Sequence, residues 1–118
     1  MIKYTIYGND YYFDYNVFAQ RETARLCPEG KIQNLPVLLN QNGNQAEMYD
    51  NFIKLIVAVN KGGNLTAKYN GINEIKEIEE DMLLSLSSEQ FNDLCSVCFS
   101  TISEGSKTEV EGKANNKS

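Results

Sequence analysis

Hydrophobic and polar residues alternate at the start of the chain and then recur at helical spacing. Residues 2–7 and 11–15 are rich in β-branched and aromatic residues, and Gly8-Asn9-Asp10 between them tolerates the positive φ angles of hairpin turns. This pattern predicts a β-hairpin with two apolar sets: Ile2, Tyr4 and Ile6 on one face, and Tyr11, Phe13 and Tyr15 on another. Because an isolated hairpin is unstable in water, we expect this one to pack against helices.

Capping signals predict two helices after the hairpin. Asn16 is a suitable N-cap for a helix over 17–26, which Pro28 and Gly30 stop. Pro36 fits the first turn of a short helix over 35–39, where a missing N–H is tolerated.

The clearest helical pattern begins after Asn44. Glu47 stands in the capping-box position, and apolar residues recur at helical spacing to Val59. We expect Gly62-Gly63 to end this helix. Alternation over 65–69 then predicts a third short strand or an extended loop.

Two further helices are predicted in the last third of the chain. Ile72, Ile75, Ile78 and Met82 indicate a helix with its apolar side facing inward. Ser87 and Gln90 form a second capping box, and Gly105 closes the amphipathic helix that follows. Beyond Gly105 the apolar periodicity is lost, so residues 106–118 are predicted to be a disordered polar tail.

Length and composition favour a single small domain. The chain has 118 residues, of which 42% are hydrophobic, enough to bury a core. We therefore expect one α+β domain over residues 1–105, in which an N-terminal β-hairpin packs against a bundle of four to five helices.

The charge balance excludes some partners. A net charge of −5 argues against nucleic acid and anionic membranes, both of which attract basic surfaces. The apolar runs are too short to span a bilayer, and Met1 leads directly into the predicted strand without a signal peptide. Three cysteines fit reduced thiols better than a disulfide framework, so we expect a cytoplasmic protein.

The sequence offers no familiar catalytic constellation. It contains no histidine, which excludes Ser-His-Asp and Cys-His chemistry. Cys95 and Cys98 have CxxC spacing, but they lie on the apolar stripe of a predicted helix, which favours core packing over redox chemistry. Zinc would need two more ligands, and Cys27 is the only other cysteine. We expect no enzyme activity, no metal and no cofactor.

Tyrosines are concentrated in the hairpin, where five of the seven lie within the first 15 residues. Without interleaved basic residues they do not indicate a nucleic-acid stacking platform. Two interpretations remain: a half-buried sheet, or a self-association surface formed by Tyr4, Tyr11 and Phe13.

The layout resembles the tail assembly chaperones of long-tailed phages that infect Gram-positive bacteria. Those small acidic proteins open with a hairpin of the type xIxIxGKxYxxxF, continue through helices and end in a charged tail. The matching stretch here is residues 2–15, followed by the helices after Asn16, Asn44 and Ser87 and by the ending from Glu109 to Lys117. The usual Gly-Lys of the turn is Gly8-Asn9 in this chain.

The resemblance implies a non-enzymatic role in tail assembly. Such chaperones coat the tape-measure protein, help the tail-tube protein polymerise around it, act as homo-oligomers and often have a longer form made by ribosomal frameshifting. The groove for a partner helix would be formed by Phe52, Ile56, Phe91 and Leu94. The competing interpretation, which burial statistics favour, is that these four residues form the intramolecular core.

Two other classes of function stay open. The acidic stretch from Glu74 to Asp81 suits a small phage-type inhibitor that mimics nucleic acid to block a host defence protein. A small enzyme using carboxylate or thiol chemistry would depend on residues such as Glu80 or Cys98.

Overall fold

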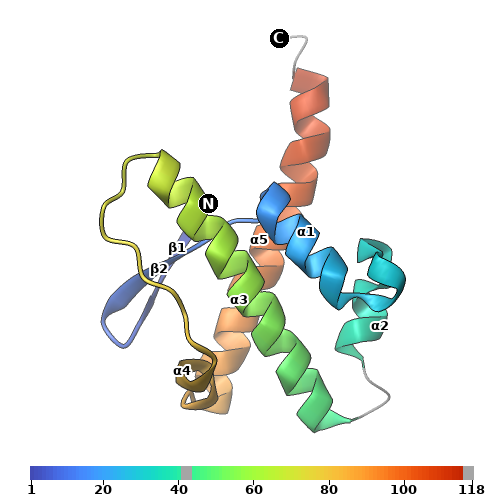
Figure 1. The fold of residues 1–118 in the computed structure, drawn as a ribbon, viewed down its shortest axis with the longest axis vertical. Coiled ribbons are helices and arrows are strands. Elements are labelled where there is room, and N and C mark those ends of the chain that lie inside the picture. Colours follow the sequence, from blue (N-terminus) through green and yellow to red (C-terminus); the bar gives the residue numbers. More distant parts are fainter. Residues whose placement is uncertain (41–43, 116–118) are drawn as a thin grey trace.

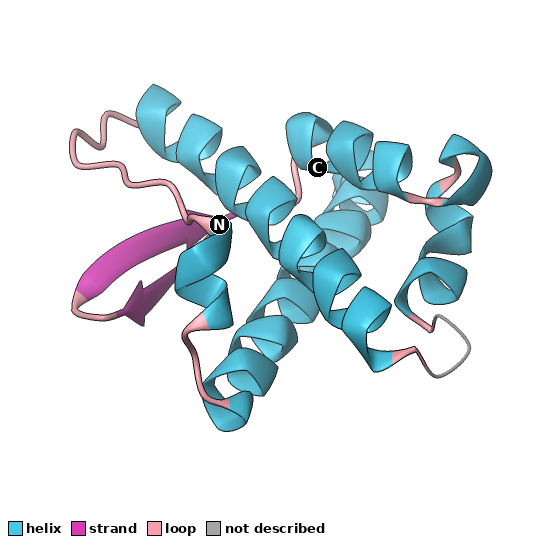
Figure 2. Cartoon of the chain, turned by 60° about the horizontal axis from the view of Figure 1, so that its bottom comes forward, coloured by secondary structure: helices cyan, strands magenta, loops and turns pink. Residues whose placement is uncertain are grey.

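The computed structural model describes residues 1–40 and 44–115, with side chains as far as Gly105. An antiparallel hairpin precedes helices that pack together, which confirms the predicted α+β arrangement (Figure 1). Figure 2 shows the hairpin at one side of the helical body. In chain order the elements are β1 (Ile2–Ile6), β2 (Asn9–Phe13), α1 (Val17–Leu26), the short turns η1 (Pro28–Gly30) and η2 (Ile32–Asn34), α2 (Leu35–Leu39), α3 (Gln45–Tyr69), α4 (Glu80–Leu84) and α5 (Ser88–Asn115).

The hairpin turn is shorter and earlier than predicted. Tyr7 and Gly8 have φ angles of 50° and 77°, as in a two-residue turn with positive φ at both positions, and Asn9 already belongs to β2. The two apolar sets also share one face, because residues paired across an antiparallel ladder point to the same side. The pairs are Ile2 with Phe13 and Tyr4 with Tyr11.

The predictions for α1 and α2 are confirmed. The Asn16 side chain accepts a hydrogen bond from the Ala19 amide at 3.1 Å, so it caps α1 as expected. The helix ends one residue before Cys27, and Pro36 lies in the first turn of α2.

The predicted end of α3 is wrong. Its start is confirmed, because the Asn44 side chain accepts from the Glu47 amide at 3.1 Å. Gly62-Gly63, however, lie inside the helix, which continues to Tyr69 and replaces the strand or loop expected over 65–69.

The two glycines allow β2 to approach the helix backbone. A Cβ atom on Gly62 would lie 2.6 Å from the Asp14 carbonyl oxygen, and one on Gly63 would lie closer still to the main chain of Tyr12. The Asp14 amide donates to the Val59 carbonyl at 3.2 Å across this contact. These glycines therefore serve a close contact between two backbones rather than a helix stop.

The buried amide of Asn60 joins three segments. It is fully buried, its Nδ2 donates to the Tyr12 carbonyl at 2.9 Å, and its Oδ1 accepts from the Ile78 amide at 3.0 Å. Both partners would otherwise be main-chain groups without a hydrogen bond from a helix or strand.

Residues 72–79 form neither helix nor strand, so the helix predicted there is largely wrong. Gly71, with a φ angle of 82°, follows the end of α3, and only α4, over 80–84, is helical. Ile78 is buried as expected, but its amide bonds to Asn60 rather than to a carbonyl one turn back. Tertiary hydrogen bonding thus replaces the helix that the spacing of isoleucines suggested.

The capping box of α5 is confirmed. The Gln90 amide donates to Ser87 Oγ at 3.2 Å, and the Ser87 amide donates to Gln90 Oε1 at 3.0 Å. Gly105 does not end this helix, which runs to Asn115. A Cβ atom on Gly105 would lie 2.8 Å from Tyr15 Cβ, so the glycine again serves a close approach. The domain boundary at residue 105 and the disorder of 106–118 stay predictions, because side chains beyond Gly105 lie outside the described part.

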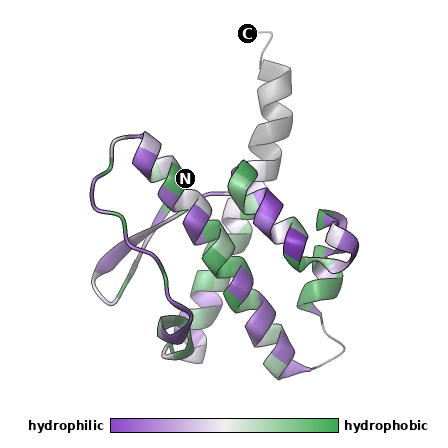
Figure 3. Cartoon of the chain, viewed as in Figure 1, coloured by the Kyte–Doolittle hydropathy of each residue, from purple (hydrophilic) through white to green (hydrophobic). Residues whose placement is uncertain are grey.

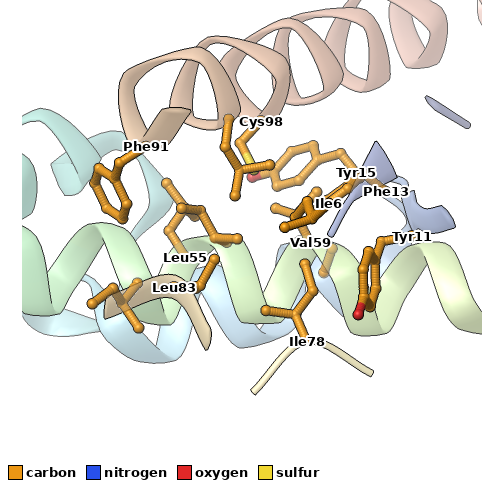
Figure 4. Packing of buried hydrophobic residues seen from close by; sticks show 14 residues of the cluster. Ile6, Tyr11, Phe13, Tyr15, Leu55, Val59, Ile78, Leu83, Phe91 and Cys98 are labelled. Atoms are coloured by element: carbon orange, nitrogen blue, oxygen red, sulfur yellow. The ribbon is translucent and has the colours of Figure 1, made fainter. Parts of the chain in front are cut away.

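Helix α3 is the central element of the fold. It contacts β2, α1, α2, α4 and α5, and its hydrophobic residues lie mainly in its middle, where it crosses α5 (Figure 3). The buried cluster extends from Phe91 and Leu83 at one end to Tyr11 at the other (Figure 4). Every element that borders the site described below is therefore held against one helix.

Replacing Gly63 with alanine tests the backbone contact. Where a helix interior has room for the added methyl group, replacing glycine with alanine raises the free energy of unfolding by about 1 kcal/mol. Here we expect a loss of about 2 kcal/mol, because the new methyl group overlaps the main chain of Tyr12. Denaturant unfolding measures the change, and Lys61→Ala, at an exposed position of the same helix, is the control. Stabilisation by Gly63→Ala would contradict the contact.

Replacing Asn60 with alanine tests the three-segment junction. We expect the free energy of unfolding to fall by about 3 kcal/mol, since the part-buried Tyr12 carbonyl and the buried Ile78 amide both lose their partner. Asn64→Ala is the matched control, because the bond from Asn64 to the Lys76 carbonyl is exposed. Equal losses in the two variants would show that Asn60 has no special role.

Candidate partner-binding surface

The predicted groove residues lie mostly inside the protein. Ile56 and Leu94 are fully buried, and Phe91 is 6% exposed. Phe52 is partly buried and packs edge-to-face on Phe99, with ring centroids 5.7 Å apart. The intramolecular core therefore accounts for Ile56, Phe91 and Leu94 in the folded chain, and only Phe52 keeps substantial exposure.

The predicted self-association residues are also occupied within the chain. Tyr11 and Phe13 are buried in the core. Tyr4 is partly exposed, and its hydroxyl donates to the Asp93 carboxylate of α5. That hydrogen bond, with burial and the negative charge of Asp93, raises the pKa of Tyr4 to about 12. The apolar face of the hairpin thus packs on the helices, and a role in self-association stays a prediction.

An apolar hollow lies where α3, α4 and the start of α5 meet. Its volume is about 230 Å³, and we call it the α3–α4–α5 hollow. Ile53, Leu83 and Phe91 are its buried members, whereas Leu84 is 68% exposed and Tyr49 is 41% exposed. The full lining is Tyr49, Ile53, Leu83, Leu84, Leu86, Ser88 and Phe91.

The rim of this hollow is held in place by packing between helices. The Tyr49 ring lies 5.3 Å from the Phe91 ring, centroid to centroid, which joins α3 to α5. The amide of Leu86 donates to the Leu83 carbonyl at 3.3 Å, and the Ser85 amide donates to Met82, so the chain turns tightly after α4. Leu84 is thereby presented outward beside a pocket built from buried neighbours.

A larger hollow elsewhere is used by the fold. It has a volume of about 550 Å³ and lies between the start of β1, the start of α1 and the part of α5 from Thr101 to Gly105. Its polar residues Asp14 and Asn16 already bond to Thr66 and to the Gly62 carbonyl. Those groups anchor the hairpin to α3, so size alone does not make this hollow the better candidate.

The two CxxC thiols are packed rather than activated. Cys98 is buried in the core, and Cys95 is half-buried one turn earlier on α5. Burial raises the pKa of Cys95 to about 11, and burial together with the neighbouring Cys95 thiol raises the pKa of Cys98 further. A thiolate nucleophile needs the opposite shift.

The described residues do not form a metal site, and the acidic residues suggested for catalysis lie exposed at a helix start. Over residues 1–40 and 44–105, no three His, Cys, Asp or Glu side chains gather as a metal-binding group. Glu79, Glu80 and Asp81 are exposed at the start of α4, where their charge suits the helix N-terminus. No helix in the described ranges has the length and apolar character needed to cross a bilayer.

Thiol alkylation tests the raised pKa of Cys95. At about pH 8 we expect the folded protein to react with iodoacetamide about 100-fold more slowly than the unfolded chain, since the thiol pKa of the latter is about 8.5. The rate should still be rising when the pH passes 9, because only the thiolate reacts and its population grows up to the pKa. Mass spectrometry of the alkylated peptide follows the reaction. Equal rates in folded and unfolded chains would contradict the burial.

Comparison with known proteins gives no match: no protein-family model, curated protein or solved structure is similar enough to this chain to indicate a relationship.

Proposed function

We propose that this chain is a non-enzymatic phage tail assembly chaperone that binds an apolar helix of the tape-measure protein in the α3–α4–α5 hollow. The observation that supports this proposal is the exposure of Leu84 and Tyr49 beside a pocket with a buried apolar floor. Leu84 and Tyr49 line one hollow together with the buried apolar residues of its floor, and contiguous apolar patches of this kind are typical of surfaces that bind other proteins.

The geometry suits recognition of a helix. All three walls are helical, and a hollow of about 230 Å³ has room for an apolar side chain of a partner. Leu84 and Tyr49 at the rim would contact the neighbouring apolar residues of the same partner face. Such contacts would remove from water the surface that makes a long apolar helix aggregate.

The charge of the chain supports the same role. A net charge of −5 would keep a complex with an apolar partner soluble. In this proposal the protein works in the cytoplasm of the host cell, forms a homo-oligomer along the tape-measure protein and promotes assembly of the tail-tube protein around it.

A binding module fits this chain better than an enzyme because its candidate thiol nucleophiles have raised pKa values. The raised pKa values of Cys95 and Cys98 keep both thiols protonated at neutral pH. The sequence also has no histidine to act as a general base.

Light scattering tests the proposed function. The mass of the purified chain is measured alone and after co-expression with the products of neighbouring genes. We expect an oligomer that captures a long, predominantly helical partner. A stable monomer that captures none of these products would overturn the proposal.

A second candidate is the acidic inhibitor that mimics nucleic acid. The observation that favours it is the exposure of Glu74, Glu77, Glu79, Glu80 and Asp81 along one segment. An inhibitor of this kind would bind a nuclease tightly at low salt and lose that binding as salt screens the charges. Binding that persists at high salt would exclude this alternative.

A further inference from the structure

We propose that the α3–α4–α5 hollow takes an amphipathic helix whose apolar face is flanked by lysine or arginine residues. This inference rests on the proposed function and adds to it the chemistry of the partner. It follows from the distribution of charge around the hollow.

Acidic residues are concentrated on the segments that build the hollow. Residues 45–54 and 79–93 contain a single basic residue, Lys54, out of 11 in the chain. The same residues contain seven of the 16 acidic ones, and all seven are exposed: Glu47, Asp50, Glu79, Glu80, Asp81, Glu89 and Asp93.

These carboxylates have no cationic partner within the described part of the chain. The ion pairs there join other groups, such as Lys3 with Asp10 and Arg25 with Glu22. Among the described contacts, Asp93 alone of the seven accepts a side-chain hydrogen bond, from the Tyr4 hydroxyl. Glu80 lines a separate hollow together with Lys54 and Lys61, and Glu89 and Asp93 line another beside Tyr4. The other four carboxylates, among them Asp50 next to Tyr49, belong to the segments that build the α3–α4–α5 hollow and are available to a partner.

The helix N-termini explain only part of this charge. Glu47, Glu80, Asp81 and Glu89 lie in the first turns of α3, α4 and α5, where the partial positive charge of the helix dipole favours them. Asp50 lies beyond the first turn of α3, next to Tyr49 on the rim. The N-termini of α3, α4 and α5 each carry a partial positive charge of about one half, which is too little to neutralise seven carboxylates. The segments that build the hollow therefore keep a negative potential.

An apolar pocket built from segments rich in exposed carboxylates favours a partner of the opposite charge. An apolar side chain fills the pocket, and lysine or arginine residues on either side of the apolar stripe reach the carboxylates. An acidic amphipathic helix would bury the same apolar area but bring like charges together, which lowers its affinity.

Two synthetic peptides of about 20 residues test this inference, a length that can form a helix on binding. Both carry leucine at helical spacing on one face; the flanking positions are lysine in one peptide and glutamate in the other. Fluorescence anisotropy with the full chain measures binding. We expect the lysine peptide to bind at least about tenfold more tightly, with an affinity that falls as salt is added.

Two matched variants locate the binding site. Leu84→Ser removes an exposed apolar side chain from the rim, and we expect it to weaken binding of the lysine peptide about tenfold. Val37→Ser removes a side chain of similar exposure on α2, away from the hollow, and should leave the affinity unchanged. Both positions are largely exposed, so both variants should fold.

The remaining outcomes would overturn the inference. Equal affinity for the two peptides would show that charge does not select the partner, and absence of binding by the lysine peptide would exclude this ligand class. Equal losses in the two variants would exclude the hollow as the site. A self-associated form of the purified chain that Leu84→Ser dissociates would identify a second copy as the occupant. The proposed function is tested separately, by capture of a co-expressed partner, so either test can fail without the other.

Discussion

The fold depends on how closely the hairpin backbone can approach α3. Gly62 and Gly63 leave room for the main chain of residues 12–14, and the Asp14 amide then bonds to the Val59 carbonyl. With β2 fixed at this distance, Phe13 and Tyr11 reach the buried cluster and the Tyr12 carbonyl reaches the amide of Asn60. The same amide holds Ile78, and the chain that continues from Ile78 forms α4 beside the hollow. A side chain at either glycine would therefore disturb elements that it does not touch.

Local signals predict the local structure well. Asn16, Asn44 and the pair Ser87–Gln90 all cap helices as expected, because each cap depends only on residues within one turn. Predictions fail where a distant segment decides the outcome. A glycine that ends a helix and a glycine that admits another backbone are the same residue in the sequence, and only the position of β2 distinguishes them at Gly63. The non-helical conformation around Ile78 likewise depends on an asparagine 18 residues earlier.

The residues of the candidate surface were also predictable only in part, because distant segments decide which apolar side chains are exposed. The sequence identified strongly apolar residues such as Ile56 and Leu94, and those are the residues that the core needs. The exposed side chains of the hollow are less conspicuous. Leu84 follows Met82 and Leu83, and a helix of one turn cannot bury all three, so one apolar residue faces water. The sequence signal for this surface is that α4 contains more apolar residues than the core can bury. The position of the exposed residue could be known only from the path of the chain between α3 and α5.

The long-range attachment of the hairpin also has a consequence during synthesis. Tyr4 bonds to Asp93, 89 residues later, and the backbone contact of β2 requires Gly63. Because β1 and β2 precede these partners in the chain, they leave the ribosome before α3 and α5 and remain without their packing partners until those helices have followed. Contacts this distant in sequence slow folding, because a long loop must close before they form. The nascent chain thus leaves a tyrosine-rich, β-prone segment unpacked for seconds at ordinary translation rates, and at that stage the segment is most open to pairing with another chain.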